Sequence, residues 1–224
     1  AMKSGIPKEK TAYVVNQVCG SGLRSIASGF QSIKAGDSKI VVAGGQECMS
    51  LSPHAIHLRD GKKLGNSEVT DTMIKDGLWD AFHGYHMGVT AENVSTKFQV
   101  TREDQDKFAL NSHEKALKAQ KENKFKEEII NLKIKSKKNE IQFNKDEHPR
   151  EEINLEALAR LKPVFKKDGT VTAGNASGIN DGAAAITLMS AEEAEKRKLQ
   201  KLVSIKSWAS CGVDPSLMGT GPIP

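Results

Sequence analysis

The chain has 224 residues, of which 38% are hydrophobic and 27% charged, and this composition suits a globular protein of one or two domains. Its 33 basic residues are interleaved with 28 acidic ones, so the net charge of +5 can attract phosphate-bearing polyanions without implying nucleic-acid binding. Three widely spaced cysteines favour neither a disulfide framework nor a zinc site. No signal peptide opens the sequence and no apolar run has bilayer length, so we expect a cytoplasmic protein without a membrane partner.

The first elements in chain order surround Cys19. Residues 1–12 predict a helix end, a glycine stop and a loop. Residues 13–18 are mostly β-favouring and predict a short strand, whereas apolar side chains at three- and four-residue steps predict an amphipathic helix from residue 23 onward. Gly20 lets the backbone approach a ligand or another segment closely. Cys19 is therefore expected in a tight turn between a strand and a helix.

Two interpretations of Cys19 compete. A lone cysteine is most often a small buried hydrophobe. At the start of a helix, however, unpaired N–H groups and the positive end of the helix dipole favour the thiolate, which is the nucleophilic form. A cysteine kept for packing does not need glycines around it, so the surrounding Gly-Ser-Gly favours the nucleophile.

The stretch N-Q-V-C-G-S-G-L-R-S, from Asn16 to Ser25, resembles the nucleophile segment of the thiolases. Thiolases are acyl-CoA acetyltransferases, which join two acyl-CoA molecules or split a 3-ketoacyl-CoA with free CoA. The resemblance implies that Cys19 is the catalytic nucleophile. It also implies an α/β fold, a thiolase-like layered α/β sandwich that is incomplete in this chain and carries an inserted, mostly helical loop domain. No cofactor and no metal are implied, because the CoA thioesters acetyl-CoA and acetoacetyl-CoA are themselves the substrates.

A second strand is predicted shortly after this helix. Residues 39–43 read as a fully buried strand. The following G-G-Q-E-C-M-S, residues 44–50, resembles the G-G-x-E-x-M-S segment of the thiolases. Together with residues 13–18 and the intervening helix, this predicts a crossover unit whose two strands pair in parallel.

The middle of the chain, from residue 51 to about residue 167, is polar and turn-rich and contains most of the lysines. Residues 90–98 predict one helix, and the spacing of Thr101 and Asp104 predicts a capping box that begins another. The lysines between residues 115 and 138 favour a solvated surface over a binding patch. The second helix has a narrow face of mostly small side chains at Phe108, Ala109, Ser112, Ala116 and Ala119.

The stretch T-V-T-A-G-N-A-S-G-I-N-D-G-A-A-A, Thr170 to Ala185, resembles a second thiolase motif. Its residues predict a short strand, a glycine-hinged loop and then a helix of very small residues at 183–185. Residues 186–189 predict a buried strand and residues 190–198 a charged helix. Residues 203–213 predict the first strand of a second half.

The domain organisation follows from combining these elements with the resemblance. The family forms dimers or tetramers, so we expect a homo-oligomer. The predicted domains are an N-terminal core segment with the nucleophile (1–48), a loop domain over the CoA site (49–179), a return to the core (180–201) and a truncated C-terminal half (202–224).

The CoA contacts are implied by the resemblance, residue by residue. His86 alone is more often a structural histidine, but H-M-G followed by T-A-E-N-V matches the acetoacetyl-CoA type of thiolase and favours short, unbranched acyl groups. Arg150 would pair with the nucleotide end, because guanidinium suits phosphate and stacks on rings. A serine common near the family's adenine site is Ala157 here, which puts one hydrogen bond in doubt. The implied contacts are Leu78, His86, Met87, Arg150, Ala173, Ser177 and Gly178.

Three alternatives stay open. The family motifs N-E-A-F, G-H-P and C-x-G-G do not occur in these 224 residues, so we expect no condensation by this chain alone, and a non-catalytic acyl-CoA-binding or interaction fragment is one alternative. A 3-ketoacyl-CoA thiolase of fatty-acid degradation is the second, and a basic nucleic-acid-binding domain is the third and weakest. Hydrolase-elbow, dinucleotide and P-loop motifs are lacking, and the six histidines lack metal-site spacing.

Overall fold

A computed structural model describes residues 1–135 and 139–224. The chain divides into two compact units, each built from two stretches of sequence. Among the described residues, no helix combines the length and apolarity that a bilayer crossing requires. Unit 1 comprises Ala1–Met73 and Asn180–Ser210, and unit 2 comprises Ile74–Ile179 and Cys211–Pro224. The domain boundaries at 48, 179 and 201 stay a prediction.

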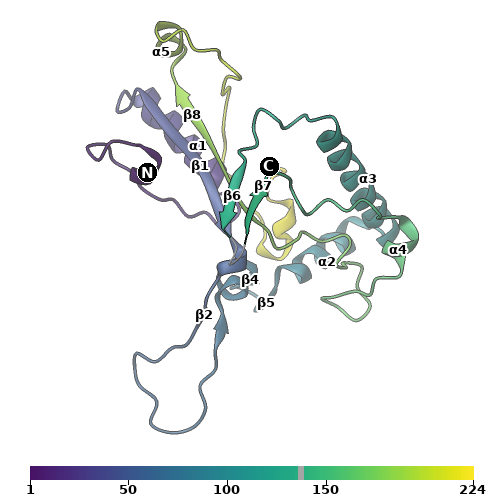
Figure 1. Cartoon of the computed structure of the whole chain (residues 1–224). Helices are drawn as coiled ribbons and strands as arrows, with labels where there is room; N and C mark the ends of the chain where they lie inside the picture. Colours follow the sequence, from purple (N-terminus) through teal and green to yellow (C-terminus); the bar gives the residue numbers. More distant parts are fainter. Residues whose placement is uncertain (136–138) are drawn as a thin grey trace. The chain divides into compact units, whose positions relative to one another are not determined.

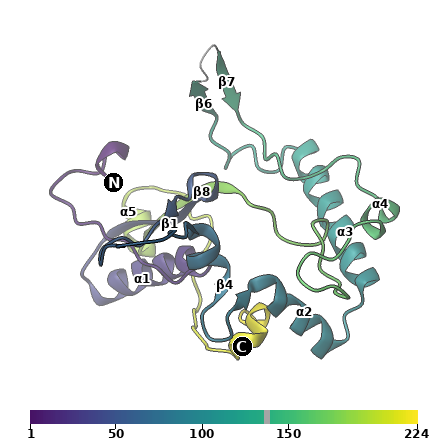
Figure 2. The same cartoon turned by 90° about the horizontal axis from the view of Figure 1, so that it is seen from below.

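Unit 1 is centred on a two-stranded antiparallel sheet. Strand β1 (Ile40–Cys48) pairs with β8 (Asp181–Met189), from Ile40 opposite Met189 to Cys48 opposite Asp181. Helix α1 (Ser21–Ala35) lies along one face of this pair (Figures 1 and 2). The close approach requires a glycine, because a Cβ on Gly29 would lie 2.9 Å from Leu188 Cδ1 and 3.0 Å from Val41 Cγ1.

The remaining elements of unit 1 are short. The helix predicted at 190–198 is confirmed as α5 (Ala191–Lys196), with the Ser190 side chain accepting from the Glu193 N–H. The predicted helix end near the N-terminus is also confirmed, as a 3₁₀ turn that stops at Gly5 with φ 85°. The other short elements are β2 (His54–Ala55), which pairs with β3 (Thr70–Asp71), and the 3₁₀ turns Met2–Ser4 and Met49–Leu51.

Several strand predictions in unit 1 are wrong in kind or in pairing. Residues 13–16 form no strand, and only an isolated bridge joins Gln17 and Cys19, so the predicted parallel crossover is absent from the described chain. Residues 183–185 lie inside β8 rather than in a helix, because pairing with β1 overrides the helix preference of alanine. Residues 203–213 form no strand either.

Burial of the two strands is lower than predicted. Residues 39–43 and 186–189 do contribute to strands, but Ile40, Val42 and Ile186 are 37%, 55% and 44% exposed. Val41 and Leu188 face α1, whereas their neighbours alternate to the other face, as the two-residue period of a strand requires. This alternation accounts for the exposure of Ile40 and Val42, which lie on the opposite face, but not for that of Ile186, which lies two residues from Leu188 and shares its face.

Unit 2 combines helices with two short pairs of strands. Its α-helices are α2 (Met87–Phe98), α3 (Arg102–Lys121) and α4 (Leu155–Ala159). Strand β4 (Trp79–Asp80) pairs antiparallel with β5 (Tyr85–His86), and β6 (Leu132–Lys135) pairs antiparallel with β7 (Glu140–Phe143). A π-helical segment, Met73–Leu78, precedes β4, and a 3₁₀ segment at Pro215–Thr220 packs on α2.

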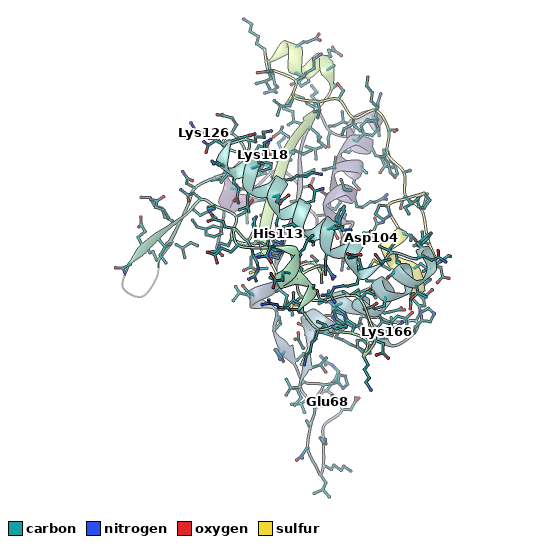
Figure 3. The ribbon with its side chains drawn as sticks, turned by 90° about the vertical axis from the view of Figure 1, so that its right-hand side faces the viewer. Glu68, Asp104, His113, Lys118, Lys126 and Lys166 are labelled. Atoms are coloured by element: carbon teal, nitrogen blue, oxygen red, sulfur yellow. The ribbon has the colours of Figure 1, made fainter. Side chains whose placement is uncertain are left out.

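The two helices predicted in this region are confirmed. In the capping box of α3, the Asp104 N–H donates to Thr101 Oγ1 at 3.1 Å and the Thr101 backbone N–H donates to Asp104 Oδ2 at 3.4 Å. Figure 3 shows Asp104, His113 and Lys118 along α3. The lysines from 115 to 135 are exposed, as a solvated surface requires, whereas Lys137 and Lys138 lie outside the described residues. The strand predicted at the start of the 170–185 motif is wrong, because residues 170–172 are irregular.

Candidate active site

Cys19 is exposed and lies two residues before the start of α1. Two backbone hydrogen bonds close a tight turn around it: the Gly20 N–H donates to the Gln17 carbonyl at 2.9 Å, and the Ser21 N–H donates to the Val18 carbonyl at 3.1 Å. Gly20 is the N-cap of the helix. The predicted position of Cys19 at the mouth of a helix is confirmed, although the element before it is a turn and not a strand.

The residue before the cysteine is strained. Val18 has φ 47°, in the left-handed region that β-branched residues avoid, at a cost of about 1–3 kcal/mol. Two side chains hold it there. Asn16 Oδ1 accepts from the Val18 N–H at 2.9 Å, and the Ser21 hydroxyl donates to the Val18 carbonyl at 2.7 Å while accepting from the Gln17 N–H at 2.8 Å. The strained turn keeps the Cys19 side chain outside apolar packing.

The helix that carries this turn is fixed to β1. The Ser25 hydroxyl donates to the Gly44 carbonyl at 2.8 Å and accepts from the Gly44 N–H at 3.0 Å. A Cβ on Gly45 would lie 3.2 Å from Gly22 Cα, so two glycines allow the first turn of α1 to touch the strand. The N-terminal end of α1 is thereby held in place beside Cys19.

In unit 2, His86 has a defined tautomer. Its Nδ1 accepts from the Gly88 N–H at 3.0 Å and caps α2, so Nδ1 carries no proton. Burial lowers the pKa of His86, which keeps the ring neutral. The ring stacks on Phe165 with centroids 4.7 Å apart. The remaining N–H is on Nε2, where it can donate to a ligand, and Met87 follows directly as the first residue of α2.

A cavity of about 340 Å³ lies between α3 and the Gly174–Ser177 segment. His113 lines it from α3 and stacks on His148, with ring centroids 5.8 Å apart. Burial, and then the charges of His148 and Arg150, lower the pKa of His113, whose Nδ1 accepts from the Arg150 N–H at 3.2 Å. The full lining is Phe108, Ala109, Ser112, His113, Ala116, His148, Pro149, Gly174, Asn175, Ala176 and Ser177.

The predicted CoA contacts fall into two groups within unit 2. Ser177 lines the cavity, and the backbone of Arg150 reaches it through His113. Leu78, His86 and Met87 lie around the start of α2 and are not among the lining residues. Ala173 and Gly178 flank the segment that lines it; Ala173 and Ser177 are exposed.

Sequence reasoning did not single out His113, Asn16 or Ser21 as site-forming residues. The asparagine two residues before Cys19 and the serine two residues after it are typical of turns in which a side chain bonds the nearby backbone. That pattern was available in the sequence. The role of His113 depends on residues 148–150, which are distant in the sequence.

Comparisons with known proteins agree with these features. The family profile described as "Thiolase, N-terminal domain" matches residues 1–192, and the chain belongs to the thiolase family. It is 57% identical over 224 residues to the "Acetyl-CoA acetyltransferase" of Rhizobium meliloti (strain 1021), covering 100% of this chain and 57% of that relative. A rat relative, "Acetyl-CoA acetyltransferase, cytosolic", is 52% identical over 223 residues, with 99% and 56% covered.

Solved structures show the same fold. The Bacillus anthracis acetyl-CoA acetyltransferase superposes with a TM-score of 0.95 at 46% identity, covering 98% of this chain and 56% of that chain. Human mitochondrial 3-ketoacyl-CoA thiolase gives 0.95 at 40% identity, covering 100% and 57%. The predicted thiolase-like α/β fold is confirmed. The chain thus spans somewhat more than half the length of the relatives it matches.

Proposed function

We propose that the chain is the nucleophile-bearing part of an acetyl-CoA C-acetyltransferase of the thiolase type. The carrying observation is the exposed Cys19, held by a strained, hydrogen-bonded turn at the start of α1. In the first step the Cys19 thiolate attacks the carbonyl carbon of acetyl-CoA. The carbon–sulfur bond to CoA breaks, CoA takes up a proton and leaves, and an acetyl group stays on the cysteine.

In the second step another acetyl-CoA loses an α-proton to a base. The resulting carbanion attacks the acetyl carbonyl carbon, and the bond to Cys19 Sγ breaks, which gives acetoacetyl-CoA and restores the thiolate. The reverse sequence is thiolysis. Both steps develop negative charge on a carbonyl oxygen and require preorganised donors.

The CoA moiety would be bound by unit 2. The Nε2–H of His86 can donate to a polar group of the CoA thioester, and the Arg150 guanidinium suits a phosphate. No cofactor beyond the thioester substrate is proposed. The other proposed contacts are Leu78, Met87, Ala173, Ser177 and Gly178.

The setting of the protein is also a proposal. The name of the rat relative supports a cytoplasmic location. Oligomerisation to a dimer or tetramer is proposed for the protein that carries this chain, without nucleic-acid or membrane partners.

A second candidate uses the same chemistry on longer substrates. The similarity to human mitochondrial 3-ketoacyl-CoA thiolase supports a 3-ketoacyl-CoA thiolase that acts on longer acyl groups. Comparing acetoacetyl-CoA with longer 3-ketoacyl-CoA substrates distinguishes the two. A strong preference for the longer substrate would favour this second candidate.

The test of the proposed function is a fusion. This chain is fused to the parts of the Rhizobium meliloti relative that lie outside the matching region, and acetoacetyl-CoA formation is measured. Activity should appear in the fusion, vanish in Cys19→Ala and persist in Cys211→Ala, because both cysteines are exposed but only one precedes α1. The unfused chain should show no condensation. A fusion whose activity survives Cys19→Ala would contradict the proposal and favour a non-catalytic, acyl-CoA-binding role for this chain.

A further inference from the structure

The loop from Thr170 to Ser177 is fixed from within by a buried carboxylate. Glu92, on α2, is only 3% exposed. Its Oε1 accepts from the Thr170 N–H and the Val171 N–H, both at 2.8 Å, and its Oε2 accepts from the Thr170 N–H at 2.9 Å and the Thr170 hydroxyl at 3.0 Å. Because one side chain accepts from two consecutive backbone N–H groups, it fixes the direction in which the loop leaves residue 170.

A glycine makes room for this carboxylate. A Cβ on Gly169 would lie 2.3 Å from Glu92 Oε1 and 2.9 Å from its Cδ, far inside ordinary contact. An alanine at this position would therefore push the carboxylate away from Thr170 while leaving its charge unchanged.

A second buried carboxylate holds the other end of the loop. Asp106, on α3, is 4% exposed; its Oδ1 accepts from Asn175 Nδ2 at 3.0 Å and its Oδ2 from Arg102 Nε at 2.8 Å. Asn175 Nδ2 also donates to the Thr170 carbonyl at 3.0 Å, and Asn175 Oδ1 accepts from the Thr172 N–H at 2.8 Å. Asn175 thus ties the two ends of the loop together, and Asp106 ties Asn175 to α3.

Burial of the Glu92 and Asp106 carboxylates is not expected to stabilise the fold by itself. Buried carboxylates are seldom better for stability than apolar side chains of similar size. The residues from 170 to 176 have no regular secondary structure, so these side chains and local turns decide their conformation. The inner face of the loop meets Glu92 and Asp106, whereas Ala173 and Ser177 are exposed.

We propose that Glu92 and Asp106 are positioning residues for the CoA thioester, which act by holding the Thr170–Ser177 loop in the conformation that presents Ala173 and Ser177. This inference rests on the proposed function, because it takes the loop to be part of the CoA site. Neither carboxylate touches the ligand. Each acts through the loop backbone or through Asn175.

Isosteric variants test the proposal. Glu92→Gln and Asp106→Asn keep the shape but place an N–H₂ donor against groups that already donate. Gly169→Ala displaces Glu92 without changing charge. Glu114→Gln is the matched control, because Glu114 is an exposed carboxylate on α3 and its replacement makes the same change of charge. Removing a negative charge does not by itself weaken binding of the anionic CoA, so a loss of affinity in Glu92→Gln or Asp106→Asn is not an effect of charge alone.

Two measurements are made on the 224-residue chain. The first is the dissociation constant for CoA by calorimetry, and the second is amide hydrogen exchange at Thr170 and Val171. Loss of one or two hydrogen bonds to a charged group should weaken CoA binding about tenfold in Glu92→Gln and in Asp106→Asn. Gly169→Ala should weaken it likewise, with faster exchange at residues 170 and 171, while Glu114→Gln changes neither.

The outcomes are distinguishable. If the three variants exchange faster at residues 170 and 171 but bind CoA like the unaltered chain, the carboxylates only stabilise the loop and the positioning proposal is wrong, while the proposed function stands. If the unaltered chain binds no CoA, the proposed CoA site and the positioning role both fail. Weaker binding in the variants, with the control unchanged, supports both.

Discussion

Gly88 is the site at which a single methyl group should disturb the candidate CoA site most directly. It is buried at the second residue of α2, and a Cβ there would lie 2.2 Å from Phe165 Cδ2 and 2.3 Å from Cε2, where ordinary contacts begin at 3.4 Å. The Phe165 ring also stacks on His86, at 4.7 Å between centroids. In Gly88→Ala the Phe165 ring therefore has to move, and we expect this movement to disturb its stack on His86.

The expected change in the free energy of unfolding combines two losses and one gain. Overpacking a filled site costs about 1–3 kcal/mol, and loss of the aromatic stack adds about 0.5–1.5 kcal/mol. Replacing glycine by alanine in a helix returns up to about 1 kcal/mol. We expect a net loss of about 1–3 kcal/mol in the free energy of unfolding of unit 2.

The assay is urea unfolding of the chain, read by hydrogen exchange in α2 so that unit 2 is followed by itself. Gly212→Ala is the control, since a Cβ at Gly212 has no atom within 4 Å. The double variant Gly88→Ala/Phe165→Leu should recover part of the loss, because the smaller side chain vacates the contact. If the two substitutions are additive, the clash with Phe165 is not the cause and the reasoning is refuted.

Three further predictions concern a cap, a carboxyl and a thiol. Thr101→Ala should lower the stability of α3 by about 1 kcal/mol in the same exchange measurement. If no stability is lost, the capping box does not stabilise the helix. Burial raises the pKa of the Asp80 carboxyl, but hydrogen bonds from the Phe82 N–H and the His83 side chain outweigh this effect and leave the pKa below 3.8. The stability that Asp80 contributes is therefore present above pH 3.8 and lost as the pH falls further, and Asp80→Asn should flatten this acid limb in a pH series of unfolding curves. Limited iodoacetamide with peptide mapping should label Cys19 before Cys48 and Cys211; since all three are exposed, equal labelling would argue against an activated thiol.

Features set by near neighbours could be predicted from the sequence. The capping box of α3 joins Thr101 to Asp104, and the Ser190 cap of α5 reaches Glu193, so each depends on residues three apart. The turn that carries Cys19 is equally local. Such contacts form wherever the sequence places the partners, whatever surrounds them.

Features set by distant neighbours could not. The run of alanines at 183–185 has a helix preference in isolation, yet it forms a strand because residues 44–46 lie opposite. The candidate site likewise depends on both local and distant contacts. Cys19 could be predicted, but Glu92 bonds to a segment 78 residues away, and nothing in the sequence near Glu92 indicates that contact.

The Cys19 turn and the Thr170–Ser177 loop use the same physical device. Neither has a regular hydrogen-bond ladder, and in each a side-chain oxygen accepts from a backbone N–H: Asn16 from Val18, and Glu92 from Val171. An irregular backbone is fixed in this way without a helix or strand, and its outer face stays available to a ligand. At the Cys19 turn and at the Thr170–Ser177 loop, some residues would thus contact CoA, whereas others hold the backbone in place. Substituting a residue that holds the backbone should alter the affinity for CoA even where its side chain does not reach the ligand.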